Sequence, residues 1–152
     1  MGDGSDMNWY GIKDTDPRAV ALYSRHYSAQ QKASNDKWLR HGISGPGETM
    51  VLLTVDGRAL FGWIHNVIER YDKQIGVNCF VFRNEGPVTS SDLVIEASEL
   101  AQERWPGKRL FTYVNAGKIT SVNPGYCYKK AGWSYVGKSK GGLHILELLS
   151  GI

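Results

Sequence analysis

The chain has 152 residues, a formal net charge of +3, 41% hydrophobic residues and 22% charged residues. These values are typical of one globular domain and leave no room for a second independent core. No apolar run approaches the roughly 20 residues that span a bilayer, and the opening stretch MGDGSDMN lacks the pattern of a secretory signal. We therefore expect a single domain over residues 1–152 that acts in the cytoplasm and has no membrane partner.

The cysteine and histidine pattern indicates no metal centre. The four histidines are scattered, and the chain has neither a CxxC nor an HExxH motif, so no dedicated metal site is predicted. Cys79 and Cys127 lie in apolar or aromatic surroundings. We expect buried thiols, because disulfides are rare in a reducing compartment.

Positive charge is concentrated in the C-terminal part of the chain. No Asp or Glu occurs from Arg104 to Lys140, whereas eight Lys or Arg residues and seven aromatic residues lie there. This mixture suits a polyanion with exposed bases, and a solvated basic face over an aromatic core is the alternative interpretation. We expect DNA as a partner, contacted by Lys118, Lys129, Lys130, Lys138 and Lys140.

The chain opens with a segment, residues 1–14, that we expect to be a polar and mobile lead-in, although Trp9 and Tyr10 could anchor it. Asp16 followed by Pro17 predicts a helix start, because Asp accepts at an N-cap and Pro fits the first helical position. Tyr27 continues the apolar face of this helix. His26 beside it is a candidate base or phosphate ligand, with a hydrogen-bonded structural histidine as the alternative.

An antiparallel meander is predicted next. Residues 31–47 have no clear period and are expected to be irregular, with one short helix around Asp36–Leu39. The stretches TMVLLTV and ALFGWIHNV, joined by an Asp-Gly turn, predict a hairpin. Val77–Phe82 predicts the third strand of the meander.

The pattern then changes to strand, helix and strand. The helix is expected to begin at Ser90 or Ser91, either of which could cap it. Because a crossover joins the two strands, Leu110–Val114 should lie parallel to the strand before the helix. The residues that this helix is expected to bury, at helical spacing, are Leu93, Val94, Ala97, Leu100 and Ala101. A short helix opened by Asn123 and Pro124 and two strands, 133–138 and 143–149, complete the prediction.

This order of elements resembles the GNAT acyltransferase fold, an α+β fold whose mixed, mostly antiparallel sheet is flanked by helices. The segment from Tyr128 to Trp133, YKKAGW, is similar to the Tyr-x-Lys-x-Gly-aromatic signature of that family. The resemblance implies a transferase in which Tyr128 gives a proton to a leaving thiolate.

A second GNAT hallmark, the pyrophosphate loop Gln/Arg-x-x-Gly-x-Gly/Ala, corresponds to Arg83–Val88. Pro87 lacks a backbone donor, and Val88 replaces the small residue that lets backbone approach the phosphates. The sequence therefore leaves the cofactor unknown and puts ordinary acetyl-CoA binding in doubt. The residues assigned to a small-molecule donor or cofactor are Arg83, Asn84, Gly86, Ser90 and Ser91.

The middle of the chain also resembles the phage Mom-like DNA modification proteins, which have a GNAT-like fold and modify adenine in DNA. The similar stretches are FRNEG, SSDL, WPGKRLFTYVN and NPGYCYKKAGW. The resemblance implies a site made by Arg83, Ser91, Asn115 and Tyr126, with Asn115 where Mom itself is expected to carry an acid. An amide cannot act as a base, so Asn115 would orient the reacting group or simply cap a turn.

The other site residues also have structural alternatives. Arg83 could hold a phosphate or carboxylate, or form a salt bridge to Glu85 or Glu96. Tyr126 and Tyr128 are two residues apart on a predicted helix, so we expect only one of them to face the site. Either tyrosine could instead be a core aromatic residue with its hydroxyl bonded to backbone.

The sequence therefore predicts, first, a phage-type transferase that adds a small group to the exocyclic amine of adenine in DNA, with the target base extruded from the duplex. An acetyl-CoA-dependent N-acetyltransferase of a small amine or a protein lysine is one alternative. A non-catalytic nucleic-acid-binding module is the other. The predicted catalytic residues are Arg83, Ser91, Asn115, Tyr126 and Tyr128.

Overall fold

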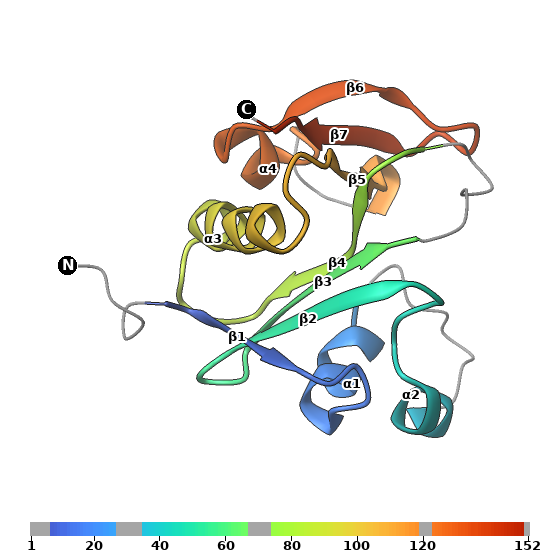
Figure 1. The fold of residues 1–152 in the computed structure, drawn as a ribbon, viewed down its shortest axis with the longest axis vertical. Helices are drawn as coiled ribbons and strands as arrows, with labels where there is room; N and C mark the ends of the chain where they lie inside the picture. The colour runs from blue at the N-terminus through green and yellow to red at the C-terminus, as the bar shows by residue number, and fades with distance from the viewer. Residues whose placement is uncertain (1–6, 27–34, 67–73, 119–122, 151–152) are drawn as a thin grey trace.

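Seven strands form one sheet in the computed structural model, which describes residues 7–26, 35–66, 74–118 and 123–150. Across the sheet the order is β1-β2-β3-β4-β5-β7-β6, and all neighbours are antiparallel except β4 and β5 (Figure 1). The strands are β1 (Trp9–Ile12), β2 (Glu48–Thr54), β3 (Ala59–His65), β4 (Val77–Asn84), β5 (Leu110–Val114), β6 (Ser134–Lys138) and β7 (His144–Leu148). This arrangement confirms the α+β, mostly antiparallel fold and its single parallel crossover.

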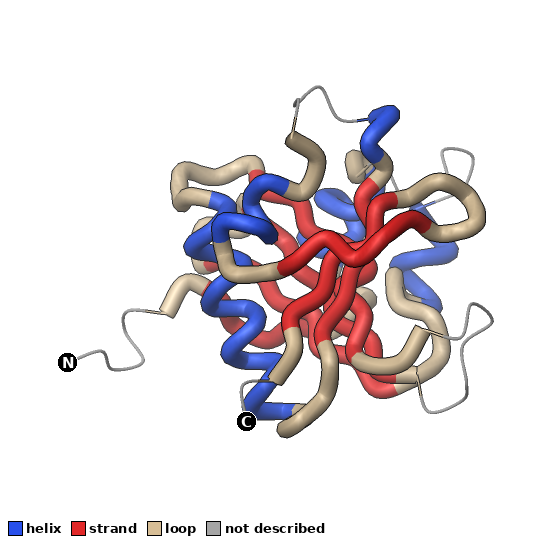
Figure 2. The backbone as a smooth tube through the Cα atoms, turned by 90° about the horizontal axis from the view of Figure 1, so that it is seen from above, coloured by secondary structure: helices blue, strands red, loops and turns tan. Residues whose placement is uncertain are grey.

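Helices cover both faces of the sheet. Two of them, α1 (Pro17–Ser24) and α2 (Asn35–His41), pack on one face, and α3 (Ser90–Arg104) and α4 (Tyr126–Lys130) lie on the other (Figures 1 and 2). The sheet thus separates two apolar cores. In the described segments, no helix combines the length and apolar character needed to cross a bilayer.

Both predicted helix starts are confirmed, but the predicted capping residue is correct only for α1. The Asp16 side chain caps α1 by accepting a hydrogen bond from the Arg18 backbone N–H at 2.9 Å. In α3, however, the N-cap is Thr89, so the expected serine cap is wrong. Ser90 instead accepts a hydrogen bond from the Asn84 side chain, and Ser91 is turned into the protein with 5% of its surface exposed.

The packing of α3 otherwise follows the predicted period. Four of its expected apolar residues are buried, and Leu100 is only partly buried. Fully buried Leu93, Val94, Ala97 and Ala101 form one stripe against the sheet.

The expected polar lead-in is wrong for its last part, because residues 9–12 form the edge strand β1. The buried Trp9 indole donates a hydrogen bond to the Leu93 carbonyl at 2.9 Å. The backbone N–H groups of Asn8 and Trp9 both donate to the Glu96 carboxylate. Helix α3 therefore holds this strand in place. Residues 1–6 and Tyr27 lie outside the described residues.

An extra residue in β4 creates a β-bulge. Gly62 of β3 pairs with Val81 and Trp63 pairs with Cys79, so Phe80 has no partner across the ladder. As a result Phe80 and Val81 both pack toward α1, whereas Cys79 packs toward α3.

Strands β4 and β5 are paired only over a short distance. Their register covers Val77–Cys79 against Leu110–Thr112, after which β4 continues along β3 and β5 continues along β7. Figure 1 shows the two strands turning away from each other. Their carboxyl ends therefore separate and leave a cleft, as expected where parallel strands part in an open sheet.

The bulge predicts a strong effect of a small substitution at Gly62. A Cβ atom there would lie 2.5 Å from Phe80 Cζ and 2.9 Å from Val81 Cγ1. We expect Gly62→Ala to lower the free energy of unfolding by about 1–3 kcal/mol, measured by urea denaturation, because an overpacked core must shift.

The matched control is Gly11→Ala in β1, where an added Cβ has nothing within 4 Å. It should leave stability within about 0.5 kcal/mol of the parent protein. Equal stability of the two variants would contradict the role assigned to Gly62.

Candidate active site

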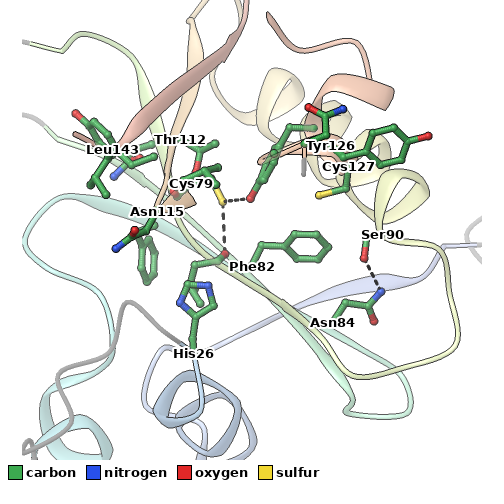
Figure 3. Close-up of a pocket in the computed structure, with 18 residues that line it drawn as sticks. His26, Cys79, Phe82, Asn84, Ser90, Thr112, Asn115, Tyr126, Cys127 and Leu143 are labelled. Carbon is green, nitrogen blue, oxygen red and sulfur yellow. Dashed lines mark hydrogen bonds between the residues drawn. The ribbon is translucent and has the colours of Figure 1, made fainter. Parts of the chain in front are cut away.

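The cleft between the parted ends of β4 and β5 has a volume of about 680 Å³. Residues 78–82 and Asn84 of β4 line one wall, and residues 112–114 of β5 line another together with Asn115, which follows the strand. Helix α4 and the end of α1 complete it: Figure 3 shows Tyr126 and Cys127 on one side and His26 on another. Because lining residues come from both faces of the sheet, the cleft is open toward both helix layers.

Tyr128 lies deep in the cleft wall. It is 7% exposed, and its ring packs against Phe82 and Trp133. Its hydroxyl lies 3.5 Å from the Cys79 Sγ atom. The position is set by α4, whose N-cap Gly125 has a φ of 75°. This is where the sequence places a proton donor.

Tyr126 lines the same cleft at a different depth. It is the first residue of α4 and has 54% of its surface exposed. The expectation that only one of the two tyrosines faces the site is therefore wrong. Tyr126 lies at the rim, and Tyr128 lies in the wall because it follows half a turn later on the helix.

Both cysteines line the cleft as thiols. Burial raises the pKa of Cys79 to about 12 and the pKa of Cys127 to about 11. Both are therefore protonated at neutral pH and are poor nucleophiles. The Cys79 thiol donates to the Val81 carbonyl at 3.5 Å, which leaves its sulfur to accept from the Tyr128 hydroxyl.

The loop after β4 is organised by the side chain of Asn84. Its Nδ2 donates to the Val88 carbonyl at 2.7 Å and to the Ser90 hydroxyl at 3.0 Å (Figure 3), and its Oδ1 accepts from the Gly86 N–H at 3.0 Å. Asn84 and Ser90 line the cleft, and Ser91 does not.

Three successive backbone positions of this loop cannot cradle a phosphate. The Gly86 N–H is used by Asn84, and the Glu85 N–H donates to the Arg58 carbonyl at 2.8 Å. The next residue is Pro87, which has no N–H. The geometry thus agrees with the sequence argument against ordinary pyrophosphate binding in this loop.

Arg83 forms the salt bridge that was its structural alternative. Its guanidinium pairs with the Glu85 carboxylate and donates to the Arg25 carbonyl at 2.7 Å. Arg25 binds both oxygens of Glu85, with Nε donating to Oε2 at 2.8 Å and Nη2 to Oε1 at 2.9 Å, so the two guanidinium groups share Oε2. Hydrogen bonds from Arg25 and Arg83 lower the pKa of Glu85 to about 2. Arg83 is not a lining residue and joins the loop to the end of α1.

His26 is a lining residue whose place in the site the sequence left open. It is 8% exposed, and its backbone N–H donates to the Tyr23 carbonyl at 2.9 Å. Burial, helped by the charge of Arg83, lowers the pKa of His26 to about 4, although a hydrogen bond to the Phe82 backbone opposes the shift. The imidazole is therefore neutral at neutral pH.

Asn115 lies at the end of β5 and lines the cleft. Its Oδ1 accepts a hydrogen bond from the Gly117 N–H at 3.1 Å, which closes the turn into the short 3₁₀-helix Ala116–Lys118. Both roles that the sequence left open, a cleft residue and a turn cap, are thus compatible with its position.

The basic segment is divided between two ends of the sheet. Arg109 precedes β5 and pairs with Glu147, whereas Lys138 pairs in register with His144 beside the carboxyl end of β5. Only the end of the sheet that carries Lys138 lies near the cleft. Lys130, Lys138 and Lys140 are exposed, and the side chain of Lys118 lies outside the described set.

Two contacts connect the basic residues at this end, Lys129, Lys138 and Lys140, to the cleft. Lys129 Nζ donates to Oδ1 of the lining residue Asn123 at 2.8 Å. The lining residue Leu143 and Ser139, which lies between Lys138 and Lys140, share two hydrogen bonds. Exposed Tyr135 lies on the same hairpin, with its ring 6.0 Å from Lys129 Nζ.

The described lining residues include no Asp, Glu, Lys or Arg. They offer side-chain amides, hydroxyls, thiols, aromatic rings and a neutral histidine. Across residues 7–26, 35–66, 74–118 and 123–150, no group of three or more His, Cys, Asp or Glu residues could hold a metal ion. The cleft is therefore suited to an uncharged, partly aromatic group.

Solved structures with a similar fold are acetyltransferases, whereas no protein-family model and no curated protein matches the chain. A spermidine N-acetyltransferase from Vibrio cholerae, in complex with CoA and spermine, is 14% identical with a TM-score of 0.62, over 97% of each chain. The aminoglycoside acetyltransferase AAC(6')-Ib with coenzyme A is 12% identical with a TM-score of 0.64, over 93% of this chain and 94% of that one.

The GNAT domain of S. lividans PAT is 15% identical with a TM-score of 0.62, over 93% of this chain and 89% of that one. Together these similarities confirm the expected GNAT fold. At such low identity they establish the fold alone, and the resemblance to Mom-like proteins stays a prediction.

His26 predicts a pH-dependent stability. Its pKa is about 4 in the folded protein and near 6.5 when unfolded, so the stability present above about pH 6.5 is lost as pH falls toward about 4. We expect His26→Gln to reduce this loss by an amount on the order of 1–3 kcal/mol, measured by urea denaturation across that range.

The control is His41→Gln, because His41 is exposed at the end of α2. Its pH profile should follow that of the parent protein. If His26→Gln lost stability as steeply as the parent on acidification, the assignment of a neutral buried imidazole would be wrong.

Proposed function

We propose that this protein is a GNAT-fold transferase that attaches a small group to the exocyclic amine of adenine in DNA. The observation that carries the proposal is the cleft: its described lining has no Asp, Glu, Lys or Arg and includes amides, aromatic rings and hydroxyls. The exocyclic amine of adenine is uncharged and is attached to a flat aromatic ring. Amides suit its polar edge, and aromatic side chains suit its faces.

The chemistry of transfer fits the residues deep in the cleft. The amine nitrogen bonds to the electrophilic carbon of the group, the bond from that carbon to its leaving group breaks, and the nitrogen gives up a proton. Tyr128, whose hydroxyl contacts a protonated thiol in the wall, would donate a proton to the leaving group. Neutral His26 would accept the proton from nitrogen directly or through water.

A base stacked inside a duplex cannot reach this site, so the proposal includes base extrusion at a cost of a few kcal/mol. Lys129, Lys138 and Lys140 lie beside the cleft and would hold the DNA backbone. Exposed Tyr126 at the rim offers a ring for stacking. A cleft of about 680 Å³ is in the range of small-molecule sites.

An acetyl-CoA-dependent N-acetyltransferase of a small amine or a protein lysine is the second candidate. Structural neighbours solved with CoA or coenzyme A favour it. Two features of this chain oppose it. The loop after β4 offers no N–H group for phosphate at Glu85, Gly86 or Pro87. The described cleft also has no carboxylate for a cationic amine.

The first prediction of this proposal concerns cellular DNA. Nucleoside mass spectrometry of plasmid DNA from cells that express the protein should show a deoxyadenosine with added mass. Tyr128→Phe removes the proton donor and should lower its yield at least about tenfold, in the range usual for general acid catalysis.

Tyr10→Phe is the matched control, because the Tyr10 hydroxyl contacts Arg18 away from the cleft. This variant should modify DNA like the parent protein. Unmodified DNA from all three folded proteins would argue strongly against DNA modification.

The second prediction separates the two candidates by the cofactor. Acetyl-CoA at about 1 mM should leave the melting temperature unchanged, because a ligand stabilises only when its concentration is comparable to or above its Kd. An aminoglycoside acetyltransferase measured in parallel is the positive control. A saturable rise in the melting temperature of this protein would favour the acetyl-CoA-dependent candidate.

A further inference from the structure

Asn78 is a polar residue in an apolar part of β4. Strand alternation turns it away from its neighbours Val77 and Cys79, which pack toward α3. Its ladder partners are Ile64 on β3 and Phe111 on β5, which are 6% and 0% exposed. Asn78 itself is 7% exposed and lines the cleft.

The side-chain oxygen of Asn78 is buried without a hydrogen-bond partner in the described part of the chain. Two other buried polar atoms share this condition, Ser44 Oγ and His144 Nδ1, and neither residue lines the cleft. An unsatisfied buried carbonyl destabilises the folded protein, and an apolar side chain of the same shape would avoid that cost. Asn78 therefore contributes less to folding than leucine would at the same place.

We propose that Asn78 is a specificity-determining residue that hydrogen-bonds the edge of the acceptor adenine. This inference rests on the proposed function. A carboxamide carries an acceptor and a donor side by side, and adenine presents an N–H donor beside a ring nitrogen acceptor, so the two pair through two hydrogen bonds. In this structure the oxygen is turned away from solvent, so the pairing requires a partial rotation about χ2, which is a soft torsion in Asn, to bring the oxygen and the nitrogen together to the base.

The neutral side chain of Asn78 disfavours aliphatic amines as acceptor substrates. An aliphatic ammonium binds best to a carboxylate, whereas a neutral amide gives it only one weaker acceptor. Asn78→Asp keeps the shape and adds a negative charge. It should weaken binding of adenine-containing DNA and strengthen binding of spermine, measured by calorimetric titration of each ligand.

The decisive experiment compares two DNA probes that differ in one amine. Each is a fluorescently labelled single strand of about ten nucleotides, with one adenine or with 2′-deoxynebularine, a purine without the exocyclic amine, at that position. By fluorescence anisotropy the parent protein should prefer the adenine strand about fivefold to a hundredfold. Asn78→Leu should reduce this preference to within about twofold, because leucine lacks both hydrogen-bonding groups.

Stability distinguishes this role from a structural one. Asn78→Leu should melt at the same temperature as the parent protein or higher, because it removes an unsatisfied polar group. A clear drop would overturn the inference by showing that the amide supports the fold. Ser44→Ala is the matched control, since it removes an orphaned buried hydroxyl outside the cleft and should leave the adenine preference intact.

The two hypotheses fail in different ways. If the parent protein binds neither strand, the proposed function fails together with the role of Asn78. If it binds both strands equally while cellular DNA still contains modified deoxyadenosine, only the role of Asn78 is overturned. If the parent prefers adenine and Asn78→Leu prefers it equally, the role of Asn78 is overturned and the proposed function stands.

Discussion

The whole site depends on the short pairing of β4 with β5. Three register pairs join the strands, after which each follows a different antiparallel neighbour. The break exposes side chains from the interior of the sheet, including Cys79 and Asn78, to a cavity. Where two strands remain paired, the neighbouring strand lies against this flank of the strand and no cavity forms there. Helix α4 and the end of α1 then supply walls that neither strand could provide.

Charge separates the interior of the cleft from its surroundings. Charged groups lie close to it but pair with other residues: Arg83 and Arg25 hold Glu85, and Lys129 Nζ donates to Oδ1 of Asn123. Inside, burial keeps an imidazole and two thiols neutral. Under the proposed function, a neutral interior beneath a basic rim would distinguish between the backbone of a nucleic acid and its bases, because phosphate is attracted to the rim and an uncharged ring to the interior.

The sequence predicted the fold well because its signals are local: the Asp16-Pro17 helix start, the hairpin turn and the apolar stripe of α3. It missed β1, because four residues with one buried tryptophan give almost no periodic signal and depend on Glu96 far along the chain. It left His26 undecided and overlooked Asn78, since only the parting of the strands makes them neighbours. Arg83 stood out by its place after a strand, but its partners Glu85 and Arg25 required the fold.

The shape of the cleft depends on Gly62, a residue outside its lining, because Gly62 contacts the lining residue Phe80. The Phe80 ring occupies the space that a side chain at Gly62 of β3 would fill. Because Gly62 has no side chain, the ring can take this position at the wall of the cavity. Any larger residue at Gly62 would displace the ring and so alter the shape of the cavity that it lines. The size of accepted ligands can thus change by substitution in the middle of the sheet while every chemical group in the site remains the same.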